Sequence, residues 1–303
     1  MKAVVLHEYG GPDKLVYEEV ADPKFADDEV LVRVKATSIN PIDWKLRSGA
    51  AKARMPLELP AILGRDLAGE VVDCGRNVTG FPRGMRVMAL TNRTYAELTV
   101  AKANLLTPIP DALSFEQAAA LPLVTITGAQ LIERAVKPAR GQTVLVTGAL
   151  GNVGRTAVHV ARQHGARVLA GVRASEREKA QRELKVDGVV ALDDEAEIGK
   201  LSNLDAIADT VNGATIQKLM KTLRAGGVLG SVLGVPEGAD KYNIRVEAFM
   251  ATPDASRLHQ LAEDVARGEF SIPIARTMKL EQIQEAQTLA EKGGAGGKIV
   301  IVP

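Results

Sequence analysis

The sequence predicts an α/β protein that combines a β-rich, turn-rich part with a doubly wound parallel sheet. Two observations lead to this prediction. Short strand-like runs bounded by Gly and Pro fill the first part of the chain. From Ser114 onward, β-branched runs alternate with amphipathic helical patterns. That order is the one a parallel sheet with crossover helices requires.

The first part of the chain predicts many short strands. Val30–Ala36 and Tyr95–Val100 alternate apolar and polar residues with the period of two expected of half-buried strands. Three further runs show the same composition: Lys2–Leu6, Leu67–Val72 and Gly84–Met88. Strands this short, separated by turn residues, favour a small barrel or sandwich. We expect the segment from Asn40 to Lys45 to be a loop, because Asn-Pro is a common turn pair.

The second part of the chain begins at a helix start signal. Ser114-Phe-Glu-Gln117 has the spacing of a capping box. Strands are then predicted at 143–147, 167–172, 188–192, 205–210 and 227–233, and helices at 152–164, 175–184 and 214–224. The last stretch returns to the texture of the first part, with helices at 254–267 and 280–292, a short strand near Ile274 and a strand at Lys298–Val302. We therefore predict a β-rich domain (1–121), a parallel-sheet domain (122–252) and a C-terminal return to the first domain (253–303).

The composition is that of an ordinary globular enzyme. The chain has 303 residues, of which 46% are hydrophobic and 25% charged, with a net charge of +1. This balance gives no sign of a nucleic-acid or acidic-membrane partner. No apolar run reaches the length of about 18 residues that a membrane-spanning helix needs. The N-terminus resembles a strand rather than a signal peptide, so we expect a cytoplasmic protein without membrane insertion. The single cysteine, Cys74, excludes an internal disulfide and a cysteine-cluster zinc site.

A glycine-rich turn joins the strand at 143–147 to the helix at 152–164. Glycine at position 151 would let the backbone approach a diphosphate, and glycine at 154 would let the helix pack closely on the strand. The free N–H groups at the helix N-terminus would then face the phosphates. The turn predicts these cofactor-binding residues: Gly148, Ala149, Gly151, Asn152, Val153 and Gly154. The alternative is a tight turn with a purely structural role.

The end of the next strand predicts which dinucleotide binds. Folds specific for NAD usually place an acidic residue there, on the ribose 2′-OH. This chain has Arg173, followed by Ser175 and Lys179, so it can offer several donors to a 2′-phosphate. These residues favour NADPH over NADH. The alternative is a solvated basic helix start, because Glu176 and Glu178 lie among the basic residues.

Several spaced motifs together resemble a known family. They are Ala36-Thr-Ser-Ile-Asn40-Pro-Ile-Asp43-Trp-Lys45-Leu-Arg47-Ser-Gly49, Gly64-Arg-Asp66-Leu-Ala-Gly69-Glu-Val, Ala118-Ala-Ala-Leu-Pro122, the glycines of the turn, and Gly297-Lys-Ile-Val300. In this order they resemble the zinc-independent medium-chain dehydrogenases/reductases of the quinone oxidoreductase (zeta-crystallin-like) branch. The resemblance implies a GroES-like catalytic domain, returning at the C-terminus, around a Rossmann domain. Relatives often dimerise through the edge of the Rossmann sheet, which here would be 227–233 to Phe249. We therefore expect a homodimer.

The resemblance also bears on metal binding. Zinc-dependent relatives hold the catalytic metal with Cys, His and Cys, and the matching positions here are Asn40, Arg65 and Leu123. An amide, a guanidinium and an alkyl group cannot build the nitrogen and sulfur site that zinc prefers. We therefore expect no metal.

A protein of this family without a metal is expected to reduce acceptors that are already electron-poor. Asn40 and Lys45 could donate hydrogen bonds to the acceptor oxygen, and Arg65 could reach the same place. The family threonine that lies against the nicotinamide matches Thr127, and Leu233 is a further predicted cofactor contact. For each polar residue a structural role stays open: Asn40 could satisfy local backbone, Lys45 could be solvated, and Arg65 could pair with Asp66 or Glu70.

The function expected from these residues is that of an NADPH-dependent reductase for quinones or α,β-unsaturated carbonyls, its partner being a small-molecule acceptor. No tyrosine follows the Asn-x-x-Asp motif, so solvent or Lys45 would protonate an enolate. Two alternatives remain open. One is a trans-2-enoyl-thioester reductase, and the other is a sensor or scaffold that binds NADPH without turnover.

Overall fold

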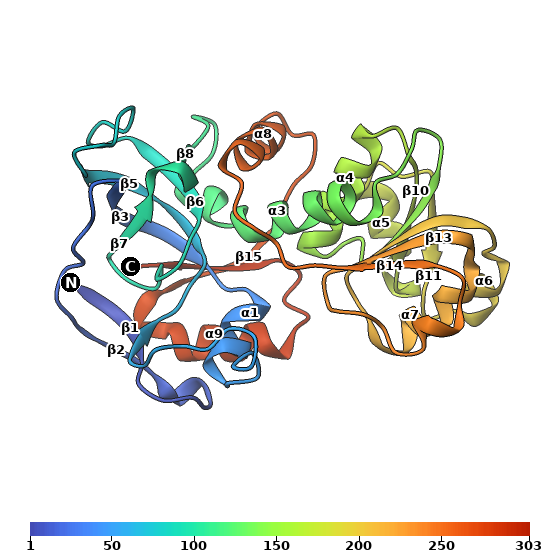
Figure 1. The fold of residues 1–303 in the computed structure, drawn as a ribbon, viewed down its shortest axis with the longest axis horizontal. Coiled ribbons are helices and arrows are strands. Elements are labelled where there is room, and N and C mark those ends of the chain that lie inside the picture. Colours follow the sequence, from blue (N-terminus) through green and yellow to red (C-terminus); the bar gives the residue numbers. More distant parts are fainter. The chain divides into compact units, whose positions relative to one another are not determined.

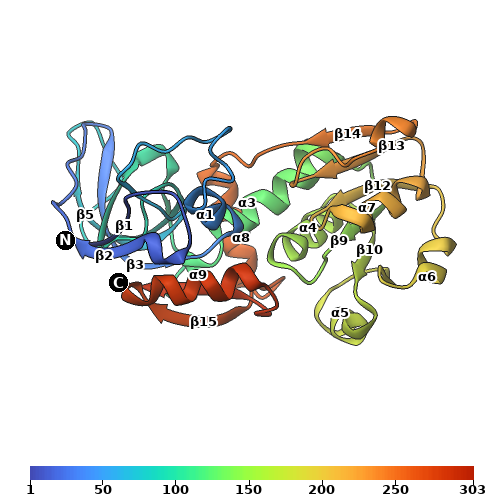
Figure 2. The ribbon, with the colours of Figure 1, turned by 90° about the horizontal axis from the view of Figure 1, so that it is seen from below.

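The computed structural model describes residues 1–303, which fall into two compact units. Unit 1 comprises Met1–Leu123, Pro253–Gly268 and Ile272–Pro303. Unit 2 comprises Val124–Thr252 and Glu269–Ser271. Figures 1 and 2 follow the chain through both units. None of the helices combines the length and apolar character that crossing a membrane would require.

Unit 1 contains two β-sheets. The smaller one has the strand order β2-β1-β4, with bounds Leu15–Glu19, Lys2–Leu6 and Ala61–Ile62. The larger one has the order β15-β16-β3-β5-β6-β8, with bounds Ile274–Lys279, Lys298–Val302, Glu29–Ser38, Asp66–Cys74, Arg86–Leu90 and Thr107–Pro108. A seventh strand, β7 (Leu98–Lys102), pairs with β3. The C-terminal strand β16 joins β3 antiparallel, so both ends of the sequence contribute to one sheet.

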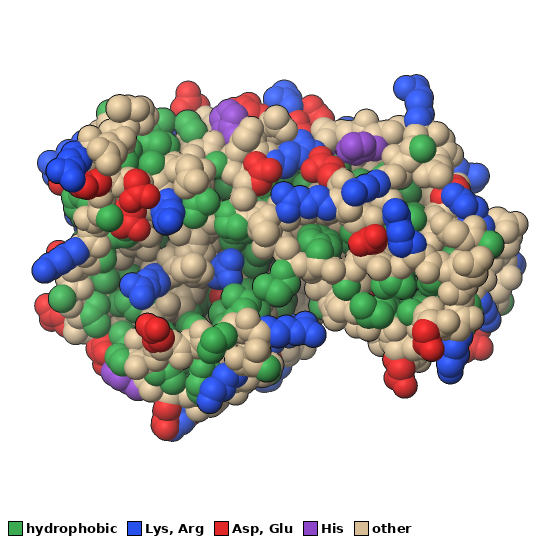
Figure 3. Space-filling model, in the orientation of Figure 1, with side chains coloured by type: hydrophobic (Ala, Val, Ile, Leu, Met, Phe, Trp, Pro, Cys, Tyr) green, Lys and Arg blue, Asp and Glu red, His purple; other side chains and the backbone are tan.

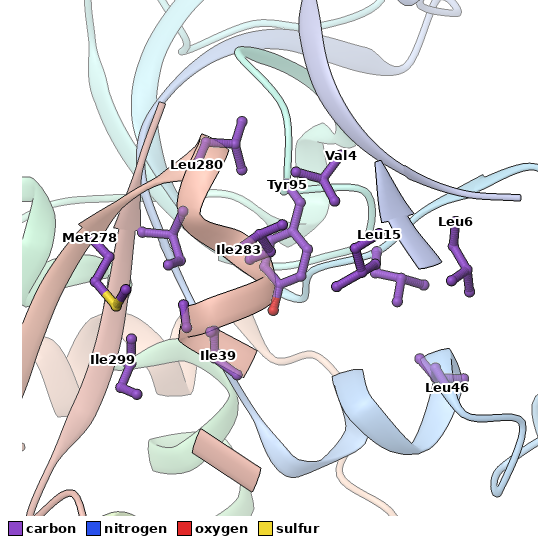
Figure 4. Close-up of a cluster of buried hydrophobic side chains, with 13 residues drawn as sticks. Val4, Leu6, Leu15, Ile39, Leu46, Tyr95, Met278, Leu280, Ile283 and Ile299 are labelled. Atoms are coloured by element: carbon purple, nitrogen blue, oxygen red, sulfur yellow. The ribbon is translucent and has the colours of Figure 1, made fainter. Parts of the chain in front are cut away.

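Four helices lie in unit 1: α1 (Pro41–Arg47), α2 (Phe115–Ala119), α8 (Ala255–Ala266) and α9 (Ile283–Lys292). The capping box predicted at Ser114 is confirmed, because its hydroxyl accepts from the Gln117 N–H and the Gln117 side chain accepts from the Ser114 N–H. A core cluster joins the ends of the chain, with Tyr95 near Leu15 and Ile283 (Figure 4).

Unit 2 is a six-stranded, all-parallel sheet with the order β11-β10-β9-β12-β13-β14. The strand bounds are Gly188–Ala191, Arg167–Val172, Thr143–Thr147, Leu204–Asp209, Leu223–Ser231 and Arg245–Ala248. The helices of this unit are α4 (Asn152–Gln163), α5 (Arg177–Glu183), α6 (Glu195–Lys200) and α7 (Gly213–Leu219). Helix α3 (Pro122–Gln130) enters the unit and continues into a π-helix at Leu131–Val136. The strand order reverses between β9 and β12, which is the switch point where such sheets bind ligands.

The structure confirms the predicted fold class, corrects one local expectation and narrows another. The segment expected as a loop, Asn40–Lys45, begins helix α1 instead, with Asn40 as its N-cap and Pro41 at the first helical position. Within the segment expected to supply the sheet edge, 227–233 to Phe249, the edge is β14, whereas 227–233 belongs largely to β13, which lies between β12 and β14. On the face shown in Figure 3, acidic and basic side chains are interspersed, as the net charge of +1 suggests.

Candidate functional site

The glycine turn lies at the carboxyl end of β9, beside the switch point of the parallel sheet. Gly148 has a φ of +59°, a left-handed conformation that favours glycine. The Ala149 N–H donates to the Gly171 carbonyl of the neighbouring strand at 3.1 Å, which fixes the turn to the sheet. Gly151 then caps α4 with an extended backbone and is itself exposed.

The turn fits a diphosphate group. A Cβ atom at Gly154 would lie against the Gly148 carbonyl oxygen, well inside van der Waals contact, so only glycine permits this close approach. At Gly151 a Cβ would meet little besides that same oxygen, which leaves the space before the helix open. No acidic side chain occupies the first turn of α4. The free N–H groups of that turn, Asn152 and Val153 among them, therefore offer an anion site.

A buried polar cluster that the sequence did not reveal fixes the same edge of the sheet. The fully buried Asp209, at the end of β12, accepts from the Thr147 hydroxyl of β9 at 2.8 Å and from the Ser231 hydroxyl of β13 at 3.1 Å. It also accepts from the N–H groups of Val211 and Asn212, both at 3.1 Å. One carboxylate thus holds the carboxyl ends of three strands together. The polar residues that end these three strands, Thr147, Asp209 and Ser231, were the sequence feature from which this cluster could have been predicted.

The residues predicted to bind a 2′-phosphate follow β10. Arg173 is 69% exposed and pairs with Glu176 at 3.1 Å, so a phosphate would compete with a carboxylate for the guanidinium. Ser175 is exposed and Lys179 half-buried. The nearby Arg177 turns away, donating to the Val189 carbonyl at 3.0 Å and pairing with Glu197.

Two other predicted cofactor contacts also lie in unit 2. Leu233 follows β13 and is 41% exposed, an unusual state for a large apolar side chain, and its N–H donates to Ser231 Oγ at 3.1 Å. Val211, after β12, is 46% exposed in the same way. Thr127 is half-buried on α3. The exposed apolar side chains are suited to contact a flat ring.

In unit 1, Asn40 belongs to a buried network centred on Asp66. The Asn40 amide donates from Nδ2 to Asp66 Oδ2 at 2.7 Å, and the Ser38 hydroxyl donates to the same oxygen. The other oxygen, Oδ1, accepts from the Leu123 N–H at 2.7 Å. Both Asn40 and Asp66 are fully buried. The structure therefore gives Asn40 internal partners, and its contact with an acceptor stays a prediction.

The cation of this network is Lys298, at the start of β16. Its ammonium donates to Asn40 Oδ1 at 2.7 Å, to the Ile39 carbonyl at 3.1 Å and to Asp66 Oδ2 at 3.1 Å. The three N–H groups of a lysine thus each have an acceptor. A buried charge needs such pairing, because an unpaired charge is costly in the interior.

Asp43 lies next to this network and is also fully buried. Its Oδ2 accepts from the Asn40 N–H and from the Tyr95 hydroxyl, both at 2.8 Å, whereas its Oδ1 has no partner. Burial raises the pKa of Asp43 to about 6, and the nearby Asp66 adds to the shift. Burial also raises the pKa of Tyr95. A tyrosine therefore does stand beside the Asn-x-x-Asp motif, supplied from a distant part of the chain.

The two predicted basic residues differ in their surroundings. Lys45 is exposed on α1. Arg65 is half-buried, its Nε atom is shielded from solvent, and that atom has no hydrogen-bond partner. No ion pair joins Arg65 to Asp66 or Glu70 in the structure; Glu70 pairs with Lys35 at 3.1 Å, and Asp66 has the donors described above.

Comparisons with known proteins find similarity to oxidoreductases. Residues 26–111 match the alcohol dehydrogenase GroES-like domain, and residues 184–301 match zinc-binding dehydrogenases. A chloroplast envelope quinone oxidoreductase homolog of Arabidopsis thaliana is 28% identical over 332 residues, covering 100% of this chain and 98% of that one. The quinone oxidoreductase of Mus musculus is 35% identical over 182 residues, covering 59% and 54%. The chain thus spans about half the length of that relative.

Solved structures extend the likeness to the whole fold. The quinone oxidoreductase from Coxiella burnetii has a TM-score of 0.89 at 26% identity, covering 100% of this chain and 99% of that one. A mycobacterial protein in complex with NADPH has a TM-score of 0.85 at 25% identity, with complete coverage of both chains. The fold is thus shared with a protein named as a quinone oxidoreductase and with one solved in complex with NADPH. In sequence and fold the chain is similar to alcohol dehydrogenase-type oxidoreductases, quinone oxidoreductases among them.

The second matching family is named for zinc, which the residues present do not fit. At the three ligand positions given by the resemblance, the Asn40 oxygen already accepts from an ammonium, Arg65 is a cation, and the Leu123 side chain has no donor atom. Zinc sites in proteins use thiolate, imidazole and carboxylate groups. The residues at these positions are therefore suited to hydride transfer without a metal.

Proposed function

We propose that this protein is an NADPH-dependent reductase that transfers hydride to quinones or α,β-unsaturated carbonyls without a metal. The observation that supports the proposal most is the carboxyl edge of the unit 2 sheet. It combines an open glycine turn at a helix N-terminus with an arginine after the second strand. The broader activity, that of an NAD(P)-dependent oxidoreductase, agrees with the names of the relatives.

Unit 2 supplies the groups that would hold the cofactor. The turn from Gly148 to Gly154 would bind the diphosphate through backbone N–H groups, and Arg173 with Ser175 and Lys179 would bind the 2′-phosphate. Leu233 and Thr127 would contact the nicotinamide. NADPH, when bound, supplies a hydride, which is two electrons and one proton.

Unit 1 supplies groups suited to a polarised oxygen. Reduction of a quinone places negative charge on a carbonyl oxygen, and a second proton must then arrive from solvent or from Lys45. Exposed Lys45 can donate a hydrogen bond to that oxygen, and half-buried Arg65 offers the acceptor a second cation. Simple ketones gain little from such a site, since they need stronger polarisation than a quinone or an enone.

The test is oxidation of NADPH and NADH against 1,4-benzoquinone, 9,10-phenanthrenequinone, a 2-alkenal and crotonyl-CoA, with and without EDTA. Turnover of a quinone or the alkenal with NADPH, unchanged by EDTA, is the expected result. Preferred turnover of crotonyl-CoA would instead support an enoyl-thioester reductase. No turnover, with NADPH still raising the melting temperature, would overturn the reductase proposal in favour of a sensor.

A further inference from the structure

Arg65 is a basic residue of unit 1 that is partly buried and left without a carboxylate partner. Its Nε atom is shielded from solvent and has no hydrogen-bond partner. The adjacent Asp66 already accepts from Ser38, Asn40, Leu123 and Lys298. Removing part of a guanidinium from water without pairing it is costly, so such a group calls for an explanation.

The backbone around Arg65 is held firmly, which limits where its side chain can go. The Arg65 carbonyl accepts from the Thr91 N–H at 2.9 Å, and the Leu63 carbonyl accepts from the Tyr95 N–H at 3.1 Å. Gly64 has a φ of +94°, and a Cβ there would collide with Thr94 and Tyr95. The chain therefore needs glycine immediately before Arg65, and the guanidinium is presented from a fixed point.

The local charge favours an anion. Lys298 neutralises Asp66 at 3.1 Å, and Lys35 neutralises Glu70 at 3.1 Å. The Arg65 side chain itself forms no ion pair or hydrogen bond within the protein, and its Nε atom is the part shielded from solvent. A planar guanidinium pairs best with a carboxylate or a similar planar anion, through two parallel hydrogen bonds.

We propose that Arg65 is a specificity-determining residue that binds an anionic substituent, a carboxylate or sulfonate, on the acceptor. The inference rests on the proposed reductase function and narrows its substrates to quinones or enones that carry a negative charge. Asn40 and Lys298 do not take part in this contact, because their polar groups are paired with each other and with Asp66.

The first experiment compares 9,10-phenanthrenequinone with its 2-carboxylate in the wild type, in Arg65→Gln and in Arg54→Gln. Arg54 is an exposed arginine of the same unit and controls for net charge. The ratio of kcat/KM for the carboxylate to that for the parent quinone should fall about 10- to 100-fold in Arg65→Gln, the range of a lost charge-assisted hydrogen bond. In Arg54→Gln the ratio should be unchanged. An equal loss for both quinones would show that Arg65 serves the reacting oxygen instead, and would overturn the inference.

Two further readouts do not depend on turnover. Quenching of Trp44, the single tryptophan, by the two quinones without NADPH should show tighter binding of the carboxylate, and Arg65→Gln should abolish the difference. The melting temperature of Arg65→Gln should match or exceed that of the wild type, because an unpaired charge is removed. A clear fall would assign Arg65 a structural role and overturn the inference. If the wild type reduced no acceptor but kept the quenching preference, only the proposed function would fail.

Discussion

At the scale of single residues, the environment of Asp43 strongly affects its ionisation. It is fully buried, one of its carboxylate oxygens has no partner, and burial raises its pKa from 3.8 to about 6. The neighbouring positive charge of Lys298 acts in the opposite direction but does not cancel the effect of burial. Folding therefore favours the protonated form of this carboxyl group.

This shift predicts how stability varies with pH. Because the folded pKa of Asp43 lies above the unfolded value, its contribution is fully favourable below about pH 4 and is lost as the pH rises through about 6. Two pKa units correspond to about 3 kcal/mol. Asp43→Asn should therefore gain melting temperature relative to the wild type between pH 5 and pH 7.5, measured by thermal denaturation. The exposed Asp111→Asn should show no such trend, and a parallel course of wild type and Asp43→Asn would contradict the assignment.

Arg173 determines the cofactor preference in the proposed function. Its guanidinium is exposed, so its pair with Glu176 adds little to stability. Arg173→Ser should raise the KM for NADPH about tenfold by removing a charge-assisted contact, with little change for NADH. Arg182→Ser, at an exposed arginine of the following helix α5, is the matched control. Equal losses for the two cofactors in steady-state kinetics would refute the 2′-phosphate role.

The sequence could indicate some of these residues and not others. Arg173 follows a predicted strand, so its place was readable from local pattern alone. Lys298 lies 258 residues along the chain from Asn40, and Tyr95 lies 52 residues from Asp43. Such partners depend on how strands pair, which local composition does not encode. The sequence likewise could not predict that Arg65 lacks a carboxylate partner, because the partners of Asp66 and Glu70 depend on the tertiary fold.

At the scale of elements, the strands and the helix around the glycine turn were predicted closely, whereas helices α1 and α6 and strand β14 were missed. Strands 143–147 and 167–172 agree with β9 and β10, because each is a short apolar run with a turn or a helical pattern beside it. Asn40-Pro41 is equally suited to a turn and to a helix start, since Asn is a good N-cap and Pro a good first residue. With seven residues, α1 is too short for its periodicity to decide.

The contact between α4 and the glycine turn predicts a sharp difference between two glycines. A Cβ at Gly154 would collide with the Gly148 carbonyl and with Ala149, whereas at Gly199 in α6 nothing lies within 4 Å. Gly154→Ala should lower the melting temperature and raise the Kd for NADPH at least tenfold, because the turn must shift. Gly199→Ala should stabilise the protein by about 0.5–1 kcal/mol, since alanine favours a helix. Thermal denaturation and calorimetric titration would measure both. Unchanged NADPH binding in Gly154→Ala would contradict the proposed turn geometry.

At the scale of the whole molecule, the open edge of the parallel sheet is the feature that bears on assembly. β14 has a neighbour only on the β13 side. The Phe249 N–H donates to the Ser231 carbonyl of β13, and N–H groups alternate in direction along a strand. The N–H groups of Val246 and Ala248 therefore point away from the sheet. Unpaired edge groups of this kind readily pair with another chain.

This edge predicts that the chain forms a homodimer by pairing β14 with its copy. Sedimentation velocity at micromolar concentration should give a species of twice the 32.2 kDa chain mass. Ala248→Pro should shift the equilibrium to the monomer, because proline removes an outward N–H without breaking the bonds to β13. Glu247→Pro is the informative comparison. The backbone N–H of Glu247 faces β13, so its loss should lower the melting temperature as well. A monomeric wild type, or a dimer that survives Ala248→Pro unchanged, would show that β14 is not the assembly edge.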